Sequence, residues 1–480
     1  MEPLSRTRPG ATRAARRRPS ATRHVFGNLG ARLVALGSVA LVTVLVARSG
    51  GAEDVGLLAL MRVLPGVVGV VSACGLPGAM GFFIGGSESD HPRLWPTVHA
   101  LMVLGGLLGT AVWMLFSVVI HEYLMTTTTF AVVVLTGVTV ATQLPVAVGK
   151  ASLQALGDTR GSNVVTAAEE AAFVPVYLLL WWAGARSGVL LVVSLLVADL
   201  LVAALAWHRL ARRTRGRALV GRYDLALARR MTAFGMRAQV GGVLSLLNLR
   251  LDVIILGALA GPAQVGVYVV ASKLAELLRL PALALTWVTY PQFARRASSA
   301  ATSTSTSMST DDALPDERGT ADTHGTQVSG PRADRGAAGA ARAPASAPTE
   351  AFATLQGLPS LPKLLAMGVV LAAVIAASGF LVLPFLYGDG FESARWPAAW
   401  IAMGLLAEPA AGVASGFVLG TGRPGLNSLI LGAGFVVTLA LDIALIPVHG
   451  SNGAAWASAA SYLVTDVLLV WAWFRLREGE

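Results

Sequence analysis

The sequence predicts an all-α polytopic membrane protein with about twelve transmembrane helices, and two observations carry this prediction. The first is composition: of 480 residues, 54% are hydrophobic and only 13% are charged, whereas a soluble domain has about 25% charged residues. The mean hydropathy is correspondingly high, at +0.64. The second is a series of apolar runs that reach the ~20 residues a helix needs to cross a ~30 Å hydrocarbon core.

These apolar runs define the predicted helices and the connections between them. The helices are expected at 28–49, 56–84, 95–120, 129–149, 161–183, 187–207, 231–259, 262–290, 362–387, 396–420, 425–447 and 453–474. We read the first run as an uncleaved span, because it is too long for the apolar region of a signal peptide.

The basic residues orient this map. Apart from those within the helices, the Lys and Arg residues fall almost entirely in alternate connections. Only three lie on the opposite side: Arg48 at the outer end of the first helix, Arg186 and Arg395. The positive-inside rule therefore predicts cytoplasmic N and C termini and an even number of helices. The same asymmetry accounts for the net charge of +10, so no nucleic-acid partner is expected, although basic segments can contact anionic membrane lipid.

The predicted organisation is two six-helix lobes with basic or disordered segments between and before them. The segments are a disordered basic cytoplasmic tail at 1–25, an N-terminal lobe at 26–208, a basic cytoplasmic linker at 209–230, and a C-terminal lobe at 231–475 that is interrupted by a cytoplasmic loop at 297–355. That loop is rich in Ser, Thr, Ala, Asp and Gly, and it lacks the large apolar residues that a core requires.

A weak internal repeat supports two parallel halves. Val55-Gly56 opens the second predicted helix and Val265-Gly266 opens the eighth, while Gly157-Asp-Thr-Arg160 and Gly420-Thr-Gly-Arg423 follow the fourth and tenth. The two members of the second matched pair are further apart in sequence than those of the first. The loop at 297–355 accounts for the difference, because it is inserted before the second member of that pair. Parallel repeats are a known transporter plan, with the substrate bound between the halves.

The two apolar segments at 231–290 carry charges at membrane depth, where each costs at least ~2.5–3.5 kcal/mol and normally faces a partner or a wet cavity. The charges are Arg237, Arg250, Asp252, Lys273, Glu276 and Arg279. Lys273 and Glu276 have the spacing of a helical ion pair, whereas Arg250 and Asp252 point to different helix faces. We interpret them as a cationic, water-accessible surface. The alternatives are that Arg237 and Arg279 reach the cytoplasmic interface and that Asp252 pairs with an arginine of another helix.

The sequence gives no sign of a catalytic residue, a cofactor or a metal centre. Cys74 is the single cysteine, which excludes an intrachain disulfide and a thiolate cluster. The stretch Val148 to Ser152 lacks the first glycine and the preceding strand of a phosphate loop. We therefore expect a protein that is not an enzyme.

At this point the chain resembles a known family, the bacterial polysaccharide flippases of the multidrug/oligosaccharidyl-lipid/polysaccharide exporter superfamily. Four stretches carry the resemblance: VARSGGAEDVGLLALMRVLPGVVGVVSACGLPGAM, LQALGDTR, the segment from FGMRAQVGGVLSLLNLRLDVIILGALAGPAQVGVYV to TYPQFAR, and VLPFLYGDGFESA with LGTGRP after it. The loop at 297–355 departs from the family in its length.

The resemblance implies a fold like that of the multidrug and toxic compound extrusion (MATE) transporters, with alternating access and a polyprenyl-pyrophosphate-linked oligosaccharide as substrate. Helices one, two, seven and eight would flank the cavity, with Asp252 and Glu276 forming charge pairs there. The predicted head-group ligands are Arg62, Lys273, Arg250, Arg32, Arg279 and Arg237, with Arg32 and Arg279 near the cytoplasmic entrance. The other intramembrane acids are expected elsewhere: Glu169, Glu170, Asp199, Glu408, Asp442 and Asp466, of which Asp442 and Asp466 are candidate structural partners of each other or of waters.

Other functions share parts of this pattern. A flippase for the peptidoglycan lipid precursor would use a similar cationic cavity. An efflux pump for organic cations would favour carboxylates and aromatic rings in the cavity, and a membrane glycosyltransferase or polymerase would need a larger extramembrane domain. We expect the leading candidate to lie in a bacterial plasma membrane, beside the polymerase and glycosyltransferases of its pathway.

Overall fold

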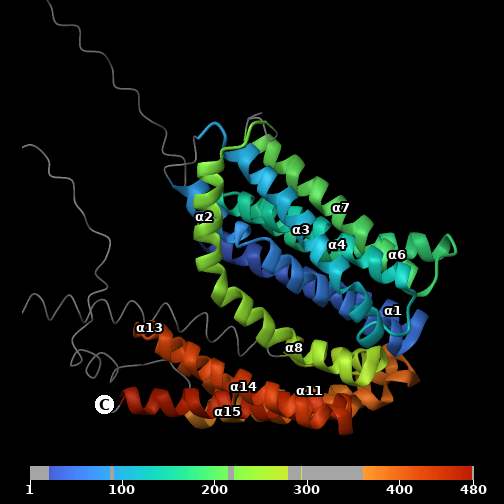
Figure 1. Cartoon of the computed structure of the whole chain (residues 1–480). Coiled ribbons are helices and arrows are strands. Elements are labelled where there is room, and N and C mark those ends of the chain that lie inside the picture. Colours follow the sequence, from blue (N-terminus) through green and yellow to red (C-terminus); the bar gives the residue numbers. More distant parts are fainter. Residues whose placement is uncertain (1–20, 87–90, 215–220, 279–292, 294–359, 478–480) are drawn as a thin grey trace, which may run out of the picture. The chain divides into compact units, whose positions relative to one another are not determined.

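The computed structural model describes residues 21–86, 91–214, 221–278, 293 and 360–477. Within these residues the chain is helical and has no strand (Figure 1). The predicted all-α class is confirmed. Residues 1–20 of the predicted N-terminal tail, the loop at 297–355 and the end of the predicted helix at 262–290 lie outside the described residues, while residues 21–25 of the predicted disordered tail are helical.

The helices form two compact units, and the long helices α1 and α8 contribute to both. The first unit comprises Met1–Leu45, Met61–His121 and Thr128–Leu246, and the second Val46–Leu60, Glu122–Thr127 and Leu247–Glu480. The first half of the chain holds α1 (Ala21–Ser72), α2 (Leu76–Gly85), α3 (Leu94–Tyr123), α4 (Phe130–Ala155), α5 (Thr159–Ala171), α6 (Phe173–Trp182) and α7 (Ser187–Arg213). The second half holds α8 (Leu225–Leu278), α11 (Leu361–Tyr387), the short η1 (Asp389–Ala394), α12 (Arg395–Gly404), α13 (Glu408–Gly420), α14 (Pro424–His449) and α15 (Ser451–Arg477).

Two glycines divide the longest helices where the sequence predicts connections. Gly51 breaks α1 with φ 73° and ψ −163°, and Gly261 breaks α8 with φ 82° and ψ 172°. Glycine adopts positive φ without the steric cost that a Cβ brings. The interval from Gly51 to Gly261 equals the interval from Gly56 to Gly266, so the two breaks extend the internal repeat.

Three predicted helices are interrupted in the structure. The helix expected at 161–183 is divided into α5 and α6 at Ala172. The helix expected at 56–84 ends at Ser72 and resumes as α2, because Cys74 and Gly75 have φ values of 46° and 73°. The helix expected at 396–420 is divided into α12 and α13. Together with η1 before it, α12 meets α13 at a 46° bend. Pro77 and Pro409 open the resumed helices, where the missing amide hydrogen costs no helical bond.

The exposed surfaces of the helices are apolar. Leu104, Leu107, Leu108, Leu115 and Phe116 of α3 are between 51% and 76% exposed, as expected of side chains that face lipid. In the described part of the chain, nine helices are long and apolar enough to cross a membrane, or ten if the bent pair at Asp389–Gly420 is one span. The chain is therefore a multi-pass membrane protein, while the exact number of twelve helices and the cytoplasmic termini stay predictions.

Each unit has a central helix. In the first unit α4 packs against α2, α5 and α7, and in the second α15 packs against α12, α13 and α14. Close approaches are made at glycine: a Cβ on Gly137 of α4 would lie 2.2 Å from the Trp113 ring, and one on Gly434 of α14 would lie 2.2 Å from Thr465 Oγ1. Small residues allow helices to pack closely inside a membrane.

Polar contacts connect the end of α7 to the start of α5 and cap the start of α8. Arg213 Nε lies 2.9 Å from Asp158 Oδ2, and Asp158 Oδ1 accepts a hydrogen bond from the Gly161 amide at the start of α5. Burial alone would raise the pKa of Asp158, but the Gly161 amide and the Arg213 guanidinium outweigh it and lower the pKa below its ordinary value. The hydrogen bond from the Leu227 amide likewise lowers the pKa of Asp224, just before α8. The predicted lobe and linker boundaries stay predictions.

Candidate substrate cavity

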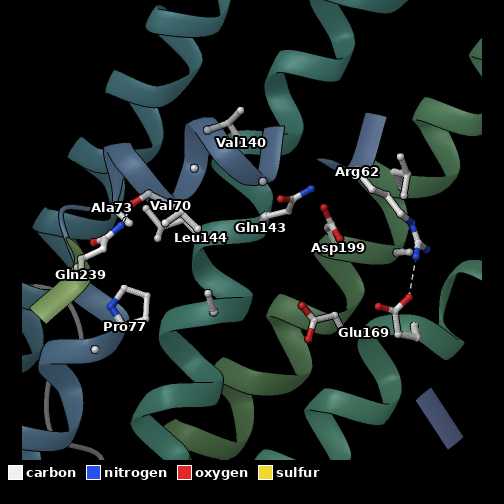
Figure 2. A pocket seen from close by; sticks show the side chains of 18 of the residues that line it. Arg62, Val70, Ala73, Pro77, Val140, Gln143, Leu144, Glu169, Asp199 and Gln239 are labelled. Atoms are coloured by element: carbon white, nitrogen blue, oxygen red, sulfur yellow. Dashed lines mark hydrogen bonds and ion pairs between the residues drawn. The ribbon is translucent and has the colours of Figure 1, made fainter. Parts of the chain in front are cut away.

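The first unit encloses a cavity of about 530 Å³. It is bounded by the part of α1 that follows Gly51, by α2, α4, α5, α6 and α7, and by the start of α8. Figure 2 shows two polar regions separated by apolar side chains, among them Val140 and Leu144. Arg62, Asp199, Glu169 and Gln143 form one region, and Gln239 lies in the other.

Ion pairs organise the first polar region. Arg62 Nη1 of α1 lies 2.7 Å from Glu170 Oε2 of α5, and the Arg62 guanidinium lies 5.4 Å from the centre of the Phe173 ring. Lys150 Nζ of α4 lies 2.5 Å from Glu169 Oε2. Each pair lowers the cost of holding charge at membrane depth, and the adjacent acids of α5 thereby connect α1 to α4.

Asp199 of α7 completes this region with a weaker contact. Its Oδ2 accepts a hydrogen bond of 3.0 Å from the Thr142 hydroxyl of α4. The amide of Gln143, one residue further along α4, also lines the cavity. The region therefore offers carboxylates that accept hydrogen bonds, a guanidinium that donates them, and an amide that can do both.

The second polar region forms where the chain breaks between α1 and α2. Gln239 Nε2 of α8 donates a hydrogen bond to the Val70 carbonyl. The backbones meet beside it, since a Cβ on Gly75 would lie 2.1 Å from the Gly235 carbonyl oxygen. Gln239 Oε1 is buried and has no partner among the described residues, so this amide retains an unused acceptor.

The charge of the cavity corrects one expectation. We expected the acids of the fifth and sixth predicted helices to lie away from the cavity, but Glu169, Glu170 and Asp199 line it together with Arg62. Even with Lys150 included, this region has three carboxyl groups and only two basic groups. The interhelical ion pairs explain the error, because each acid has a partner on a helix that is distant in sequence.

The structure describes most of the predicted ligands, which are distributed over both units. Arg62 lines the cavity, whereas Arg237, Arg250 and Lys273 are not among its described lining residues. Arg237 is exposed and Arg250 is half-buried. Nothing is described of the Arg32 side chain, and Arg279 lies outside the described residues. The assignment of these residues to a head group stays a prediction.

The predicted charge pairs have definite partners. Lys273 Nζ lies 2.6 Å from Glu276 Oε2, as the helical spacing predicted. Asp252 accepts hydrogen bonds from the Tyr268 hydroxyl and from the Val253 amide rather than forming an ion pair with a described arginine. Neither oxygen of Asp442 has a hydrogen-bond partner among the described residues, so the expectation that Asp442 and Asp466 bond to each other is wrong.

Sequence reasoning missed Gln143 and Gln239, and it misplaced the three acids. The sequence did contain a signal for the acids. A charged side chain within a membrane normally faces a partner of opposite charge, and this rule applies to Glu169 and Glu170 as much as to Arg62. Lys150, in a predicted connection, is the complementary charge. The two glutamines carry no charge, so the rule that an intramembrane charge faces a partner gives no signal for them.

Comparison with known proteins identifies the family. Residues 45–308 match the model of a family described as polysaccharide biosynthesis protein, which is more than half of the chain. The chain therefore belongs to this family of polysaccharide biosynthesis proteins. No curated protein matches the sequence significantly.

Solved structures share the fold at low sequence identity. An inward-facing multidrug resistance MATE family transporter of the MOP superfamily is 13% identical, with a TM-score of 0.63 and coverage of 96% of this chain and 99% of the other. The lipid II flippase MurJ, in an inward closed conformation, is 11% identical, with a TM-score of 0.64 and coverage of 95% and 90%. A MOP superfamily transporter from Pyrococcus furiosus, with a binding pocket described as reversed in polarity, is 12% identical, with a TM-score of 0.55 and coverage of 95% and 94%.

Proposed function

We propose that the protein is a flippase that moves a polyprenyl-pyrophosphate-linked oligosaccharide across the plasma membrane by alternating access, for the synthesis of a cell-surface polysaccharide. The observation that carries this proposal is the polar cavity around Arg62, inside a helical unit of a polysaccharide biosynthesis protein. A membrane protein of this family with the fold of exporters is suited to transport rather than to synthesis.

The chemistry of the cavity suits a substrate that combines sugar and phosphate. Sugar hydroxyls donate hydrogen bonds to carboxylates such as Glu169 and Asp199 and exchange them with the Gln143 amide. A pyrophosphate oxygen favours the planar fork of Arg62, which recognises anions with two parallel hydrogen bonds. The head group would then take the place of Glu170 as the partner of Arg62.

The membrane supplies the remaining requirements. The apolar helix surfaces allow the polyprenyl tail to stay in the bilayer while only the polar part enters the cavity. Energy for net movement would come from an ion gradient, from the membrane potential or from consumption of the product, since the sequence has no recognisable nucleotide-binding motif. One charge moving through 100 mV supplies ~2.3 kcal/mol.

Deletion of the gene tests the proposal. We expect loss of surface polysaccharide and accumulation of the lipid-linked oligosaccharide, which mass spectrometry of extracted lipids would detect. Glycosyltransferases and a polymerase of the same pathway should remain active in the deletion strain. Normal polysaccharide with no accumulated intermediate would refute the proposal.

The excess of carboxylates favours one other candidate, export of organic cations. Glu169, Glu170 and Asp199 surround part of the cavity, and Phe173 offers an aromatic ring. Each acid already has a hydrogen-bond or ion-pair partner, so this function ranks second. Increased sensitivity of the deletion strain to lipophilic cations, with normal polysaccharide, would favour it.

A further inference from the structure

A second pocket of the first unit lies at an apolar surface. It has a volume of about 100 Å³ and is bounded by the break between α1 and α2, by α3 and by the start of α8. Four residues of one face of α3 form one wall, at the spacing i, i+3, i+4 and i+7: Leu101, Leu104, Gly105 and Leu108. Leu104 and Leu108 are 62% and 51% exposed, so the pocket is accessible from the hydrocarbon of the bilayer.

Glycines bring α3 close to the end of α1. A Cβ on Gly105 would lie 3.1 Å from the Ser72 carbonyl oxygen, and one on Gly109 would lie 2.5 Å from Ser72 Oγ. The helices therefore touch at these glycines, and the larger leucines of α3 border the pocket. Met231 and Thr232 of α8 complete its lining. The pocket thus follows from the packing of three elements within one unit.

The break between α1 and α2 is the wall between this pocket and the substrate cavity. Ala73 lines both spaces, whereas Cys74 lines the pocket and Gly75 lines both the break and the cavity. Cys74 has a φ of 46°, and residues other than glycine that adopt this left-handed conformation cluster at ligand-binding and switch sites. A polar group in the cavity and an apolar group in the pocket would therefore lie on the two sides of the break.

The depth of the pocket suits the inner leaflet. The α3 residues of its wall are about 10–20 Å along the helix axis from the start of α3 at Leu94. With the predicted cytoplasmic N terminus, this start is on the cytoplasmic side. Half of a ~30 Å hydrocarbon core is about 15 Å, so the pocket would face the leaflet from which the proposed flippase takes its substrate.

The cavity offers an apolar path from Arg62 to the break. Arg62 and Ala73 are about three turns apart along α1, or about 16 Å. Val70 of α1 with Val140 and Leu144 of α4 line the cavity between its two polar regions (Figure 2). These side chains suit the isoprene units that are nearest to the pyrophosphate. The apolar middle of the cavity would then guide the tail towards the break.

We propose that the pocket holds an isoprene unit of the polyprenyl tail while the pyrophosphate lies at Arg62. A dry apolar cavity of about 150 Å³ binds benzene, and an isoprene unit has one carbon fewer, so the pocket suits a single unit. Continuity with the cavity at Ala73 favours the tail over the acyl chain of a phospholipid, whose head group stays at the membrane surface. The inference rests on the proposed function and adds a binding site for the tail.

Photo-crosslinking tests the pocket in the purified full-length protein in lipid nanodiscs. The probes are polyprenyl pyrophosphates that each carry a diazirine on a different isoprene unit, and mass spectrometry of peptides locates the crosslinks. We expect crosslinks at Cys74, within 101–108 and at Met231, with the highest yield from a unit about 16 Å from the pyrophosphate. Excess unmodified polyprenyl pyrophosphate should abolish them, whereas excess phosphatidylglycerol should not.

Two leucines of α3 provide matched variants. Leu104 and Leu107 are 62% and 63% exposed, but of the two only Leu104 is among the residues that line the pocket. Leu104→Trp should obstruct the pocket and weaken binding of polyprenyl pyrophosphate by about three- to tenfold, a modest loss because the bilayer is as apolar as the pocket. Leu107→Trp should bind it like the wild type. Native mass spectrometry measures both affinities.

Crosslinks in the pocket that phosphatidylglycerol does not suppress, with weaker binding in Leu104→Trp alone, would support the proposal. It is overturned if the crosslinks spread over the exposed surface of α3, if phosphatidylglycerol suppresses them, or if the two variants bind equally. If Leu104→Trp does not fold, the crosslinks of the wild type decide. Binding that Arg62→Gln weakens would leave the flippase proposal intact in these cases, whereas the absence of any binding would contradict that proposal as well.

Discussion

Arg62 shows at the residue scale how an intramembrane charge is tolerated and used. It is held by Glu170, and the two side chains are 27% and 29% exposed to the cavity, so the pair is neither dry nor freely solvated. A pair in this setting can exchange one partner for a ligand of the same charge. Under the proposed function, Arg62 would therefore have a recognition role as well as a structural one.

Variants separate these roles. Arg62→Gln should leave Glu170 without its cation and lower the free energy of unfolding by about 1–3 kcal/mol, less than the ~3–5 kcal/mol of a fully buried pair because water reaches both groups. It should also reduce surface polysaccharide. The double variant Arg62→Gln with Glu170→Gln should recover stability but not polysaccharide, measured by chemical denaturation and by polymer yield at equal expression. Recovery of both would show that Arg62 only neutralises Glu170.

Asp158 gives a prediction of pH dependence. Its pKa in the folded protein is lowered from 3.8, so its stabilising effect is fully present above 3.8 and is lost as the pH falls through the lowered value. Asp158→Asn retains a cap at the start of α5 but loses the charge that attracts Arg213. We expect it to cost a few tenths of a kcal/mol to ~1 kcal/mol at neutral pH.

The difference between Asp158→Asn and the wild type should shrink as the solution is acidified below that range. Unfolding followed by tryptophan fluorescence across acidic pH would measure it. If the stability of the wild type and that of Asp158→Asn still differed by the same amount in strong acid, the account would be contradicted. The ionised carboxylate of Asp158 could not then be the cause of the difference in stability.

At the scale of elements, the break between α1 and α2 is the feature that shapes the cavity. Gly75 and Pro77 were visible in the sequence as helix-breaking residues, but hydropathy continues through them, and the prediction of one helix over 56–84 followed from that continuity. Hydropathy does not show which helix packs against the break. In the structure this helix is α8, whose Gly235 approaches the break and whose Gln239 donates a hydrogen bond to the Val70 carbonyl that the break leaves free.

Gly235→Ala tests this contact. Its Cβ would lie 2.5 Å from the Cys74 carbonyl oxygen, so the helices must separate, at a cost of about 1–3 kcal/mol for an overpacked site. Gly81→Ala in α2 is the control, because its Cβ would have open space around it, and it should be neutral or slightly stabilising. Thermal unfolding in detergent measures both. Equal unfolding temperatures for the two variants would mean that the contact does not hold the break in place.

At the scale of the whole molecule, the all-α fold and most element ends could be predicted because lipid imposes a simple rule of length and polarity on each helix. The break at Gly51 and its equivalent at Gly261 fell where the connections were expected. The pairing of charges between helices could not be predicted, since Arg62 with Glu170 and Lys150 with Glu169 depend on which helices become neighbours. Resemblance pointed to the family, but it also assigned the acids of α5 and α7 to the wrong place.

The most direct measurement of the central claim is the transmembrane position of the lipid-linked oligosaccharide. Cells in which expression can be depleted would be treated with periodate, which oxidises sugars but does not cross the plasma membrane, and the modified fraction of the lipid-linked oligosaccharide would be determined by mass spectrometry. Depletion should protect the oligosaccharide from oxidation, and restoring the wild-type chain should expose it again. An unchanged oxidised fraction after depletion would contradict the account, because the substrate would then cross the membrane without this protein.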